Sequence, residues 1–543
     1  MLQRYWHTLR YLKPVQFYGR AWQRLYQPRP RQIEAMPLRQ AVGSWQGCAR
    51  VPTLLEPNHF RFLNVERELL CAEDWNRTDW PKLWLYNLHY FNDLMADGAE
   101  DRLPWHRSLI ARWIKENPPP VGNGWEPYPI SLRLVNWCQW VLAGNAPLPD
   151  MLDSMAVQTH YLRRRLEHHL LGNHLWANLK ALIFCGTLFV GHEADRWRLY
   201  GLRRLRRELA EQVLADGGHF ERSPMYHAIL LADVLDLLQL AQCFPGVLPA
   251  DEVQAWQTAA QTMLDWLHTM THPDGKISFF NDAAFGIAPE VGDLLTYAQQ
   301  LGLPTVAPAL NRPCQYLAQS GYARLRRGLA VLLADLAPVG PDYLPGHAHA
   351  DTLSFELSLG SQRVLVNAGT STYEANTQRQ NERSTAWHNT VEIDGKDSSE
   401  VWGAFRVARR ARVVNVAVEH SADGLYACAT HDGYRRLPGR VLHRRSWRLD
   451  EHCLVVEDRL EGQWQTAVAR FRVAPGFEVM NDSPAQGWIR GQHIGIQWQV
   501  TGGEVRIEDG FWHPEFGLRV PCKVLVVTLR TQRLLTRWQW IEA

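Results

Sequence analysis

A short polar segment, Leu344-Pro-Gly-His-Ala-His-Ala-Asp351, gathers three titratable side chains. His347, His349 and Asp351 alternate with alanine, and side chains two residues apart point to the same side of an extended backbone. Imidazole and carboxylate groups in such a row could bind a metal ion, transfer protons, or do both. The alternative is a polar strand entry at the surface. Because a Pro-Gly turn precedes the row and a strand-like run follows it, we expect the three side chains to share one face where a strand begins.

Three further segments place polar residues where a helix or strand begins. Asn173 and His174 follow a glycine and open a helical run. Tyr226 comes just after Ser-Pro, a pair that can cap a helix with proline at its first position. His388 and Asn389 precede a strand. Each has a structural alternative, namely a helix cap, an ordinary aromatic or a buried histidine, but loops at the ends of elements are also where sites are built.

The elements that must position these residues change type along the chain. From about residue 83 to 302, apolar residues recur at three- and four-residue spacing, which predicts amphipathic helices. The helical runs are 109–114, 130–142, 151–171, 178–189, 203–214, 229–243 and 253–270. Short Pro/Gly connections separate them, so we expect an all-α array such as an (α/α) toroid or a solenoid.

Beyond about Cys314 the pattern becomes that of short strands. The runs are 323–334, 353–359, 363–367, 412–419, 454–458, 468–473 and 524–529, with turns at 422–424, 461–462 and 502–503. Strands without intervening helices predict antiparallel sheets, most simply a sandwich. We therefore predict a basic aromatic arm and irregular wrap over 1–80, a helical domain over 81–312, and a β-sandwich over 313–543.

Composition narrows the class of protein. The 543 residues carry a net charge of +2, which gives no broad basic field for nucleic acid. Nine scattered cysteines form no Cys-x-x-Cys pair, which favours a reducing compartment. We see no secretory signal and no run of about 18 apolar residues that would cross a membrane. We expect a cytoplasmic protein without a nucleic-acid partner.

The first 32 residues form a segment of distinct character. They hold seven Arg/Lys and no Asp or Glu, interleaved with Tyr, Trp, Leu and Phe. A basic amphipathic segment can lie on an anionic membrane surface or dock on a partner. The alternative, which we favour from the sequence alone, is an arm that packs on its own protein.

The four polar segments together resemble a known family. An α domain with Asn-His and Ser-Pro-x-Tyr-His, then a β domain with His-x-His-x-Asp-x-x-Ser-Phe and His-Asn-Thr-Val, is similar to the heparinase II/III-like polysaccharide lyases. The resemblance covers residues 80–430 and, less specifically, the later strands. It implies an incomplete (α/α) toroid joined to an antiparallel β-sandwich, with a site in the cleft between them. It also implies β-elimination across a 4-linked uronic acid, so the expected partner is an acidic polysaccharide.

Two other segments add to the resemblance. Tyr86–Asn92 and Trp125–Arg133 are similar to members that lack a signal peptide and look like companions of bacterial exopolysaccharide or capsule assembly.

The resemblance also implies roles for individual residues. β-Elimination removes a proton beside a carboxylate, so the enzyme needs donors to neutralise charge, a base and an acid. Asn173 and His174 suit the carboxylate. Tyr226 suits both proton transfers if neighbouring positive charge lowers its pKa from about 10. Of His347 and His349, we expect one to be catalytic and one to support it. The residues expected to contact the glycan are Arg222, His388, Arg383, Trp125 and Tyr128.

No cofactor is required by this chemistry, but a structural zinc is implied by relatives. Its ligands would be His349, the residue at position 367, and His388. Position 367 is Asn where the metal-binding relatives have Asp, and a neutral amide is a poor zinc ligand beside two imidazoles. We therefore favour His349 and His388 as hydrogen-bonded supports over a zinc site.

Three other functions compete with a lyase. One is a non-catalytic, glycan-binding scaffold of a polysaccharide assembly system, in which residues 1–32 would be the element that docks on the membrane or on the polysaccharide synthesis machinery. Another is a glycoside hydrolase, for which Glu221, Asp282 and Asp351 are candidates without a recognisable pair. A metal-dependent amidohydrolase also uses His-x-His, but the all-β pattern after Thr352 is against it.

Overall fold

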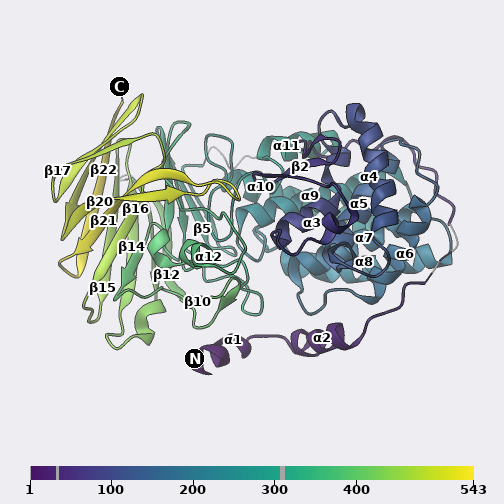
Figure 1. Cartoon of the computed structure of the whole chain (residues 1–543). Coiled ribbons are helices and arrows are strands. Elements are labelled where there is room, and N and C mark those ends of the chain that lie inside the picture. Colours follow the sequence, from purple (N-terminus) through teal and green to yellow (C-terminus); the bar gives the residue numbers. More distant parts are fainter. Residues whose placement is uncertain (1, 32, 34–35, 306–311, 422–423, 543) are drawn as a thin grey trace.

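The computed structural model describes residues 2–31, 33, 36–305, 312–421 and 424–542. Figure 1 shows a helical domain and a β domain that lie end to end, with the first two helices running along one side of both. The predicted fold class, an (α/α) toroid followed by an antiparallel β-sandwich, is confirmed. The helices end at Gln300 and the first strand of the β domain begins at Cys314. The intervening residues 306–311 lie outside the described ranges.

The toroid is built from long helices joined by short connections. Their bounds are α3 (Lys82–Tyr90), α4 (Leu103–Glu116), α5 (Pro127–Leu142), α6 (Met151–Arg164), α7 (Gly172–Leu188), α8 (His192–Gln212), α9 (Pro224–Cys243), α10 (Ala250–Thr269) and α11 (Val291–Gln300). α7 and α9 are buried on nearly every face, whereas α8 is buried along one stripe. Because α5 packs on α7, α7 on α8 and α9 on α10, the helices form an inner and an outer layer.

Tryptophan is mainly a core residue of this fold. Twelve tryptophans are less than 2% exposed, so the high Trp content reflects packing more than sugar binding. α9 is long and apolar enough by composition to cross a membrane, but 78% of its apolar window is buried inside the protein. It is a buried helix of the toroid.

One predicted helix is shorter than expected. The run 151–171 was predicted as one helix, but α6 ends at Arg164. The residues after it form a loop because their polar groups have other partners. Asn178 Oδ1 accepts from the Glu167 amide, and Leu171 has a left-handed φ of 63°. This loop leads directly into α7.

In its described residues, the β domain contains three large antiparallel sheets and one two-stranded hairpin. A five-stranded sheet has the order β4-β5-β6-β7-β8, an eight-stranded sheet β12-β13-β14-β15-β22-β19-β18-β17, and a four-stranded sheet β20-β21-β16-β9. The strand bounds are β4 (Cys314–Leu317), β5 (Tyr322–Arg327), β6 (Ala330–Asp335), β7 (Phe355–Leu359), β8 (Gln362–Leu365), β9 (Val391–Ile393), β12 (Val413–Ser421), β13 (Gly424–His431), β14 (Leu442–Leu449), β15 (Cys453–Glu461), β16 (Ala467–Arg472), β17 (Glu478–Ser483), β18 (Gln486–Arg490), β19 (Ile494–Thr501), β20 (Gly503–Trp512), β21 (Val520–Leu529) and β22 (Arg533–Glu542).

One hydrophobic core joins the three sheets. Leu332 and Phe355 of the first sheet, Trp447 of the second, and Phe471 and Leu525 of the third belong to the same buried cluster. This is the packing expected of a sandwich. The run 323–334, predicted as one strand, is the hairpin β5–β6. The predicted turn at 422–424 includes 422–423, which lie outside the described residues.

Smaller elements complete the fold. α1 (Leu2–Leu9) and α2 (Pro14–Leu25) form the N-terminal arm, and β1 (Leu54–Glu56), β2 (His59–Phe62) and β3 (Val65–Glu68) form a small antiparallel sheet beside the toroid. In the β domain, α12 (Thr377–Glu382) and the hairpin of β10 (Val401–Trp402) with β11 (Arg406–Val407) lie in the connections between strands.

Candidate active site

The start of α9 fixes Tyr226 at the junction of the two domains. Ser223 caps the helix, since its Oγ accepts from the Tyr226 amide at 3.1 Å, and Pro224 follows at the first helical position. The same Oγ donates to the backbone oxygen of Asp282 at 2.5 Å. The Ser-Pro signal in the sequence therefore marks the element that holds this side chain.

His347 and His349 point in different directions, so the predicted row of three side chains on one strand face is wrong. Residues 344–351 are irregular, and β7 begins only at Phe355. His347 faces the toroid, whereas His349 and Asp351 are buried. Asp351 accepts from the Asn281 amide. The alternation was read as a strand, but tertiary hydrogen bonds set each side chain separately.

His347 lies on Tyr226 and pairs with a carboxylate of the toroid. The two rings stack with centroids 3.9 Å apart and planes 16° apart. Nδ1 of His347 lies 2.6 Å from Oε2 of Glu221. A carboxylate that accepts the Nδ1 proton leaves the other ring nitrogen, Nε2, with a free lone pair, so this dyad can present His347 as a general base.

Glu221 stays a carboxylate despite its burial. Burial by itself raises the pKa of Glu221, but the His347 charge and hydrogen bond outweigh it, so the net pKa lies below the ordinary value. Only 2% of its side chain is exposed, compared with 13% for His347. The pair is therefore a positioned, largely desolvated dyad with the imidazole on the accessible side.

The pKa of Tyr226 moves opposite to the sequence expectation. Burial raises it well above the ordinary value, and nearby Tyr373 and Asp282 add to the effect. The hydroxyls of Tyr226 and Tyr373 are 3.0 Å apart. Among the described residues, the largest influences on this pKa are burial and the neighbouring Tyr373 and Asp282 rather than cations, so Tyr226 is a neutral phenol that can donate a proton.

The start of α7 brings Asn173 and His174 to the same junction. A Cβ on the preceding Gly172 would lie 2.5 Å from Leu344 Cδ2 and 3.3 Å from Glu221 Oε1, so this turn touches both halves of the His347 site. Tyr128 packs against His174 with centroids 4.6 Å apart.

His174 is arranged to carry positive charge. Its Nδ1 lies 3.2 Å from Glu167 Oε1, and 32% of its side chain is exposed. Burial alone would lower the pKa of His174, but Glu167 outweighs it and raises the pKa above the ordinary 6.5. A cationic imidazole next to an amide at a helix N-terminus is a suitable place for a carboxylate.

Behind this surface lies a buried polar layer that includes His349 and His388. Asp282 accepts from both arms of the Arg379 guanidinium and lies 2.8 Å from His349 Nε2. His349 Nδ1 lies 3.2 Å from His388 Nε2, and His388 Nδ1 lies 3.3 Å from Asn367 Oδ1. His349 was one of the two histidines of which one was expected to be catalytic and the other to support it, and it is 1% exposed with both its nitrogens engaged. It supports the site from behind.

The donor set around this layer does not fit the implied zinc. Among the described residues, no group of three or more His, Cys, Asp or Glu is arranged to hold a metal ion. Asn367 donates its amide to the Phe279 carbonyl, and Asp282 is neutralised by Arg379. Two imidazoles without an anionic third ligand make a poor zinc site.

The residues predicted to contact the glycan separate into two groups. Tyr128 lies at the junction beside His174. The others are held by the protein itself. Trp125 is 4% exposed and donates to the Asn117 carbonyl, Arg383 is fully buried on backbone carbonyls including that of Ala348, and Arg222 donates to the Ser320 carbonyl. Because these groups, like His388, are occupied, they shape the site without a free group for substrate.

Sequence reasoning missed Tyr373, Arg379 and Phe405. Tyr373 packs on Phe405, which is exposed, and faces both Tyr226 and His347. The signal available was weak: Tyr373 follows β8 in a polar loop of Gly, Thr and Ser, the kind of connection that carries site residues. Glu221 was considered only as a hydrolase carboxyl.

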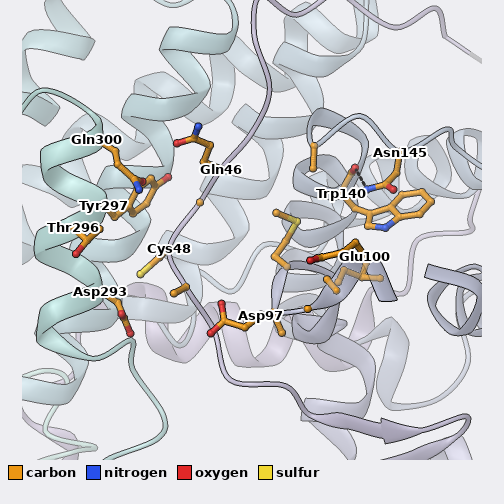
Figure 2. Close-up of a pocket in the computed structure, with 18 of the residues that line it drawn as sticks. Gln46, Cys48, Asp97, Glu100, Trp140, Asn145, Asp293, Thr296, Tyr297 and Gln300 are labelled. Carbon is orange, nitrogen blue, oxygen red and sulfur yellow. Dashed lines mark hydrogen bonds between the residues drawn. The ribbon is translucent and has the colours of Figure 1, made fainter. Parts of the chain in front are cut away.

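A separate cavity of about 750 Å³ lies elsewhere in the helical domain (Figure 2). It is lined by α11 and the segment 94–103, with residues 46–49 between them. Asp97, Glu100 and Asp293 give the cavity an acidic wall. Burial and, to a smaller extent, the negative charge of Asp97 raise the pKa of Asp293. It contains none of the predicted site residues, and its charge would repel an acidic glycan.

A helical toroid joined to an antiparallel sandwich, with proton-transfer groups at the junction, defines a class of two-domain proteins. The family matches are more specific. Residues 106–293 match the heparinase II/III N-terminal family and residues 309–541 the heparinase II/III-like C-terminal family. The chain belongs to the heparinase II/III-like family.

Relatives and solved structures agree with this assignment. A heparin-sulfate lyase of Bacteroides stercoris is 23% identical over 66% of this chain and 54% of its own length. One of Pedobacter heparinus is 25% identical over 52% and 47%. The chain thus spans about half the length of these curated relatives. A heparinase III crystal structure superposes with a TM-score of 0.69 at 17% identity, covering 86% of this chain and 79% of that one.

Proposed function

We propose that the protein is a polysaccharide lyase that cleaves a uronic-acid-containing acidic glycan by β-elimination. The observation that carries the proposal is the stack of Tyr226 on the Glu221-paired His347, next to Asn173 and cationic His174. The heparin-sulfate lyases among its relatives support it.

Each step of the reaction has a suitable group. Asn173 and His174 bind the uronate carboxylate and stabilise the negative charge that develops when the C5 proton leaves. The free nitrogen of His347 accepts that proton, and Glu221 stabilises the imidazolium that results. Tyr226, a neutral phenol, donates its proton to the glycosidic oxygen as the C4–O bond breaks. The product carries a C4–C5 double bond at its new non-reducing end.

The biological setting is part of the proposal. We place the protein in the cytoplasm, linked to bacterial exopolysaccharide or capsule metabolism. The support is the likeness of segments 86–92 and 125–133 to members associated with glycan assembly, together with nine unpaired cysteines.

A screen of acidic polysaccharides for unsaturated uronate products tests the proposal. The panel includes heparan sulfate, hyaluronan, alginate and the native glycan of the source bacterium, with product detected by ultraviolet absorbance and mass spectrometry. Tyr226→Phe is expected to lower kcat by roughly 10²- to 10⁴-fold, the usual contribution of a general acid. The matched control Tyr316→Phe changes a half-exposed tyrosine of β4 and should retain full activity.

A glycan-binding scaffold is the second candidate. Binding of an acidic glycan by wild type and Tyr226→Phe alike, without unsaturated product from any member of the panel, would favour this reading over the lyase. A hydrolase is disfavoured by the structure, because Glu221 is paired with His347, and Asp282 with Arg379 and His349. Neither carboxyl group is free to flank a glycosidic bond.

A further inference from the structure

The N-terminal arm, residues 2–25, displays an apolar surface to solvent. Trp6 is 66% exposed, Tyr18 64%, Trp22 55% and Leu25 85%. Leu2, Leu9 and Phe17 are exposed as well. The surface of a soluble protein usually exposes large apolar residues singly, whereas these two short helices expose many of them together. A contiguous apolar patch of this kind marks an interaction site.

α2 docks on the protein through its polar face. Gln16 is buried and its Nε2 donates to the Tyr343 carbonyl at 3.1 Å. Gln23 donates to the carbonyls of Arg165 and Leu166, both at 3.1 Å. Gly19 lies between them on the same face, and a Cβ there would come within 2.9 Å of His169. A helix that only covered its own protein would bury its apolar side. α2 does the reverse.

α1 likewise contacts the β domain with one face and leaves large apolar side chains exposed on another. Trp402 of β10 donates its indole N–H to Thr8 at 3.1 Å and packs edge-on against Tyr5. Leu2, Trp6 and Leu9 lie one turn or two apart along the helix and are directed outward. Figure 1 shows α1 and α2 along the same side of the molecule, where they lie beside the two domains in turn.

The arm is also strongly cationic. Its exposed arginines include Arg4, Arg10, Arg20 and Arg24, and residues 1–32 contain no Asp or Glu. In the part of the chain that the structure describes, Lys13 is the one cation of this segment with a carboxylate partner, Glu211. The remaining positive charge is available to an external anion.

We propose that the arm binds the surface of an anionic phospholipid membrane. Trp and Tyr beside arginines are the side chains that lie at the boundary between headgroups and acyl chains. The two helices have 8 and 12 residues, much shorter than the roughly 20 needed to cross a bilayer. They therefore lie in the plane of the interface, with the apolar side chains inserted and the arginines on lipid phosphates. This inference does not depend on the proposed lyase activity.

Vesicle sedimentation with the full-length protein tests the proposal. Vesicles of phosphatidylglycerol mixed with phosphatidylcholine are expected to bind the protein. Vesicles of phosphatidylcholine alone should bind it at least about tenfold more weakly, because each basic residue near an anionic surface strengthens binding. Raising the salt concentration should weaken binding to the anionic vesicles.

Two variants, each with a matched control, separate the apolar from the ionic contribution. Trp6→Ser/Phe17→Ser/Trp22→Ser should lose most vesicle binding, while the control Val51→Ser/Leu70→Ser/Val121→Ser, at exposed apolar positions outside the arm, should keep it. Arg4→Gln/Arg24→Gln should reduce binding about tenfold or more. Arg448→Gln/Arg490→Gln, on exposed strand positions, should not.

Three results would overturn the proposal. Wild-type protein could fail to bind anionic vesicles, or the control variants could lose binding as much as the arm variants. Alternatively, wild type could be an oligomer that the arm substitutions convert to a monomer, without vesicle binding. In that case the apolar surface is an interface between copies of the chain.

Discussion

The chemical character of each side chain at the junction depends on its surroundings. Glu221 fixes the ring of His347, burial keeps Tyr226 protonated, and Glu167 sustains the charge of His174. In the proposed reaction, these three residue types take the distinct tasks of base, acid and anion binder because of their surroundings.

The Glu167–His174 pair leads to a pH prediction. Because the pKa of His174 is raised, its charge is present below the ordinary pKa and is lost as pH rises through the raised value. Glu167→Gln lowers that value, so the alkaline decline of kcat/KM should move to lower pH. A pH profile on the glycan that the screen identifies measures this. Glu451→Gln, at an exposed carboxylate of the β domain, is the control. An unshifted alkaline limb would mean that His174 charge does not assist catalysis.

At the scale of elements, the site depends on how closely the α7 turn meets the 344–347 segment. Gly172 has φ of 51° and leaves room for Leu344, since a Cβ would come within 2.5 Å of Leu344 Cδ2. The close approach fixes Asn173 and His174 relative to His347. Glycine is required here for its small size as well as its conformation.

Gly172→Ala is therefore expected to damage the site more than the fold. Alanine at a left-handed position costs about 1–2 kcal/mol, and the added methyl group pushes Leu344 and the following His347 away. Gly246→Ala is a matched control, since Gly246 has φ of 77° with no atom within 4 Å of the added Cβ. Both variants should lose stability in thermal unfolding, Gly172→Ala by at least as much as the control because of the contact with Leu344, but only Gly172→Ala should lose kcat/KM by tenfold or so. Equal activity losses would contradict this.

The sequence predicted helices and strands better than it predicted which side chains contact one another. Helical periodicity located α5, α7, α9 and α10, because their repeating apolar positions reflect local geometry. The Ser-Pro pair correctly marked the start of α9. The strand over 323–334 was wrong because Gly328, with φ of 52°, turns the chain there.

The site itself depends on contacts that local pattern does not contain. Glu221 meets His347 across 126 residues of chain, and His349 meets Asp282 across 67. Alternation of histidine with alanine pointed to His347, which lies at the junction, but it predicted the wrong geometry for the segment. The pKa direction of Tyr226 failed for the same reason, since burial by residues distant in sequence sets it.

At the scale of the whole molecule, Arg222 joins the toroid to the β domain. It lies between Glu221 and Ser223, and its guanidinium donates to the carbonyls of Ser320 at 3.0 Å and Val339 at 3.4 Å. Its own carbonyl accepts from Tyr322 Oη at 2.6 Å. The residue predicted to bind glycan thus holds the two domains together beside the site.

Removing this guanidinium should weaken the contact between the domains. Arg222→Met leaves buried carbonyls without donors, which costs about 1–3 kcal/mol each. The positive φ at this position strains Arg and Met alike, so the backbone does not account for the difference. We expect a lower Tm and a lower kcat/KM, measured by calorimetry and the lyase assay. Arg459→Met, at an exposed position of β15, should change neither. Unaltered stability in Arg222→Met would show that other contacts hold the domains together.

α2 touches the two loops that lead into the reactive residues. Gln16 holds the carbonyl of Tyr343, four residues before His347, and Gln23 holds that of Leu166, just before Glu167. One helix therefore connects the loop before His347 with the loop before Glu167, and any change in the distance between these loops strains its hydrogen bonds. Thermodynamic reciprocity then requires that a ligand held by the arm in one separation and a glycan that selects the same separation strengthen each other's binding by one common factor.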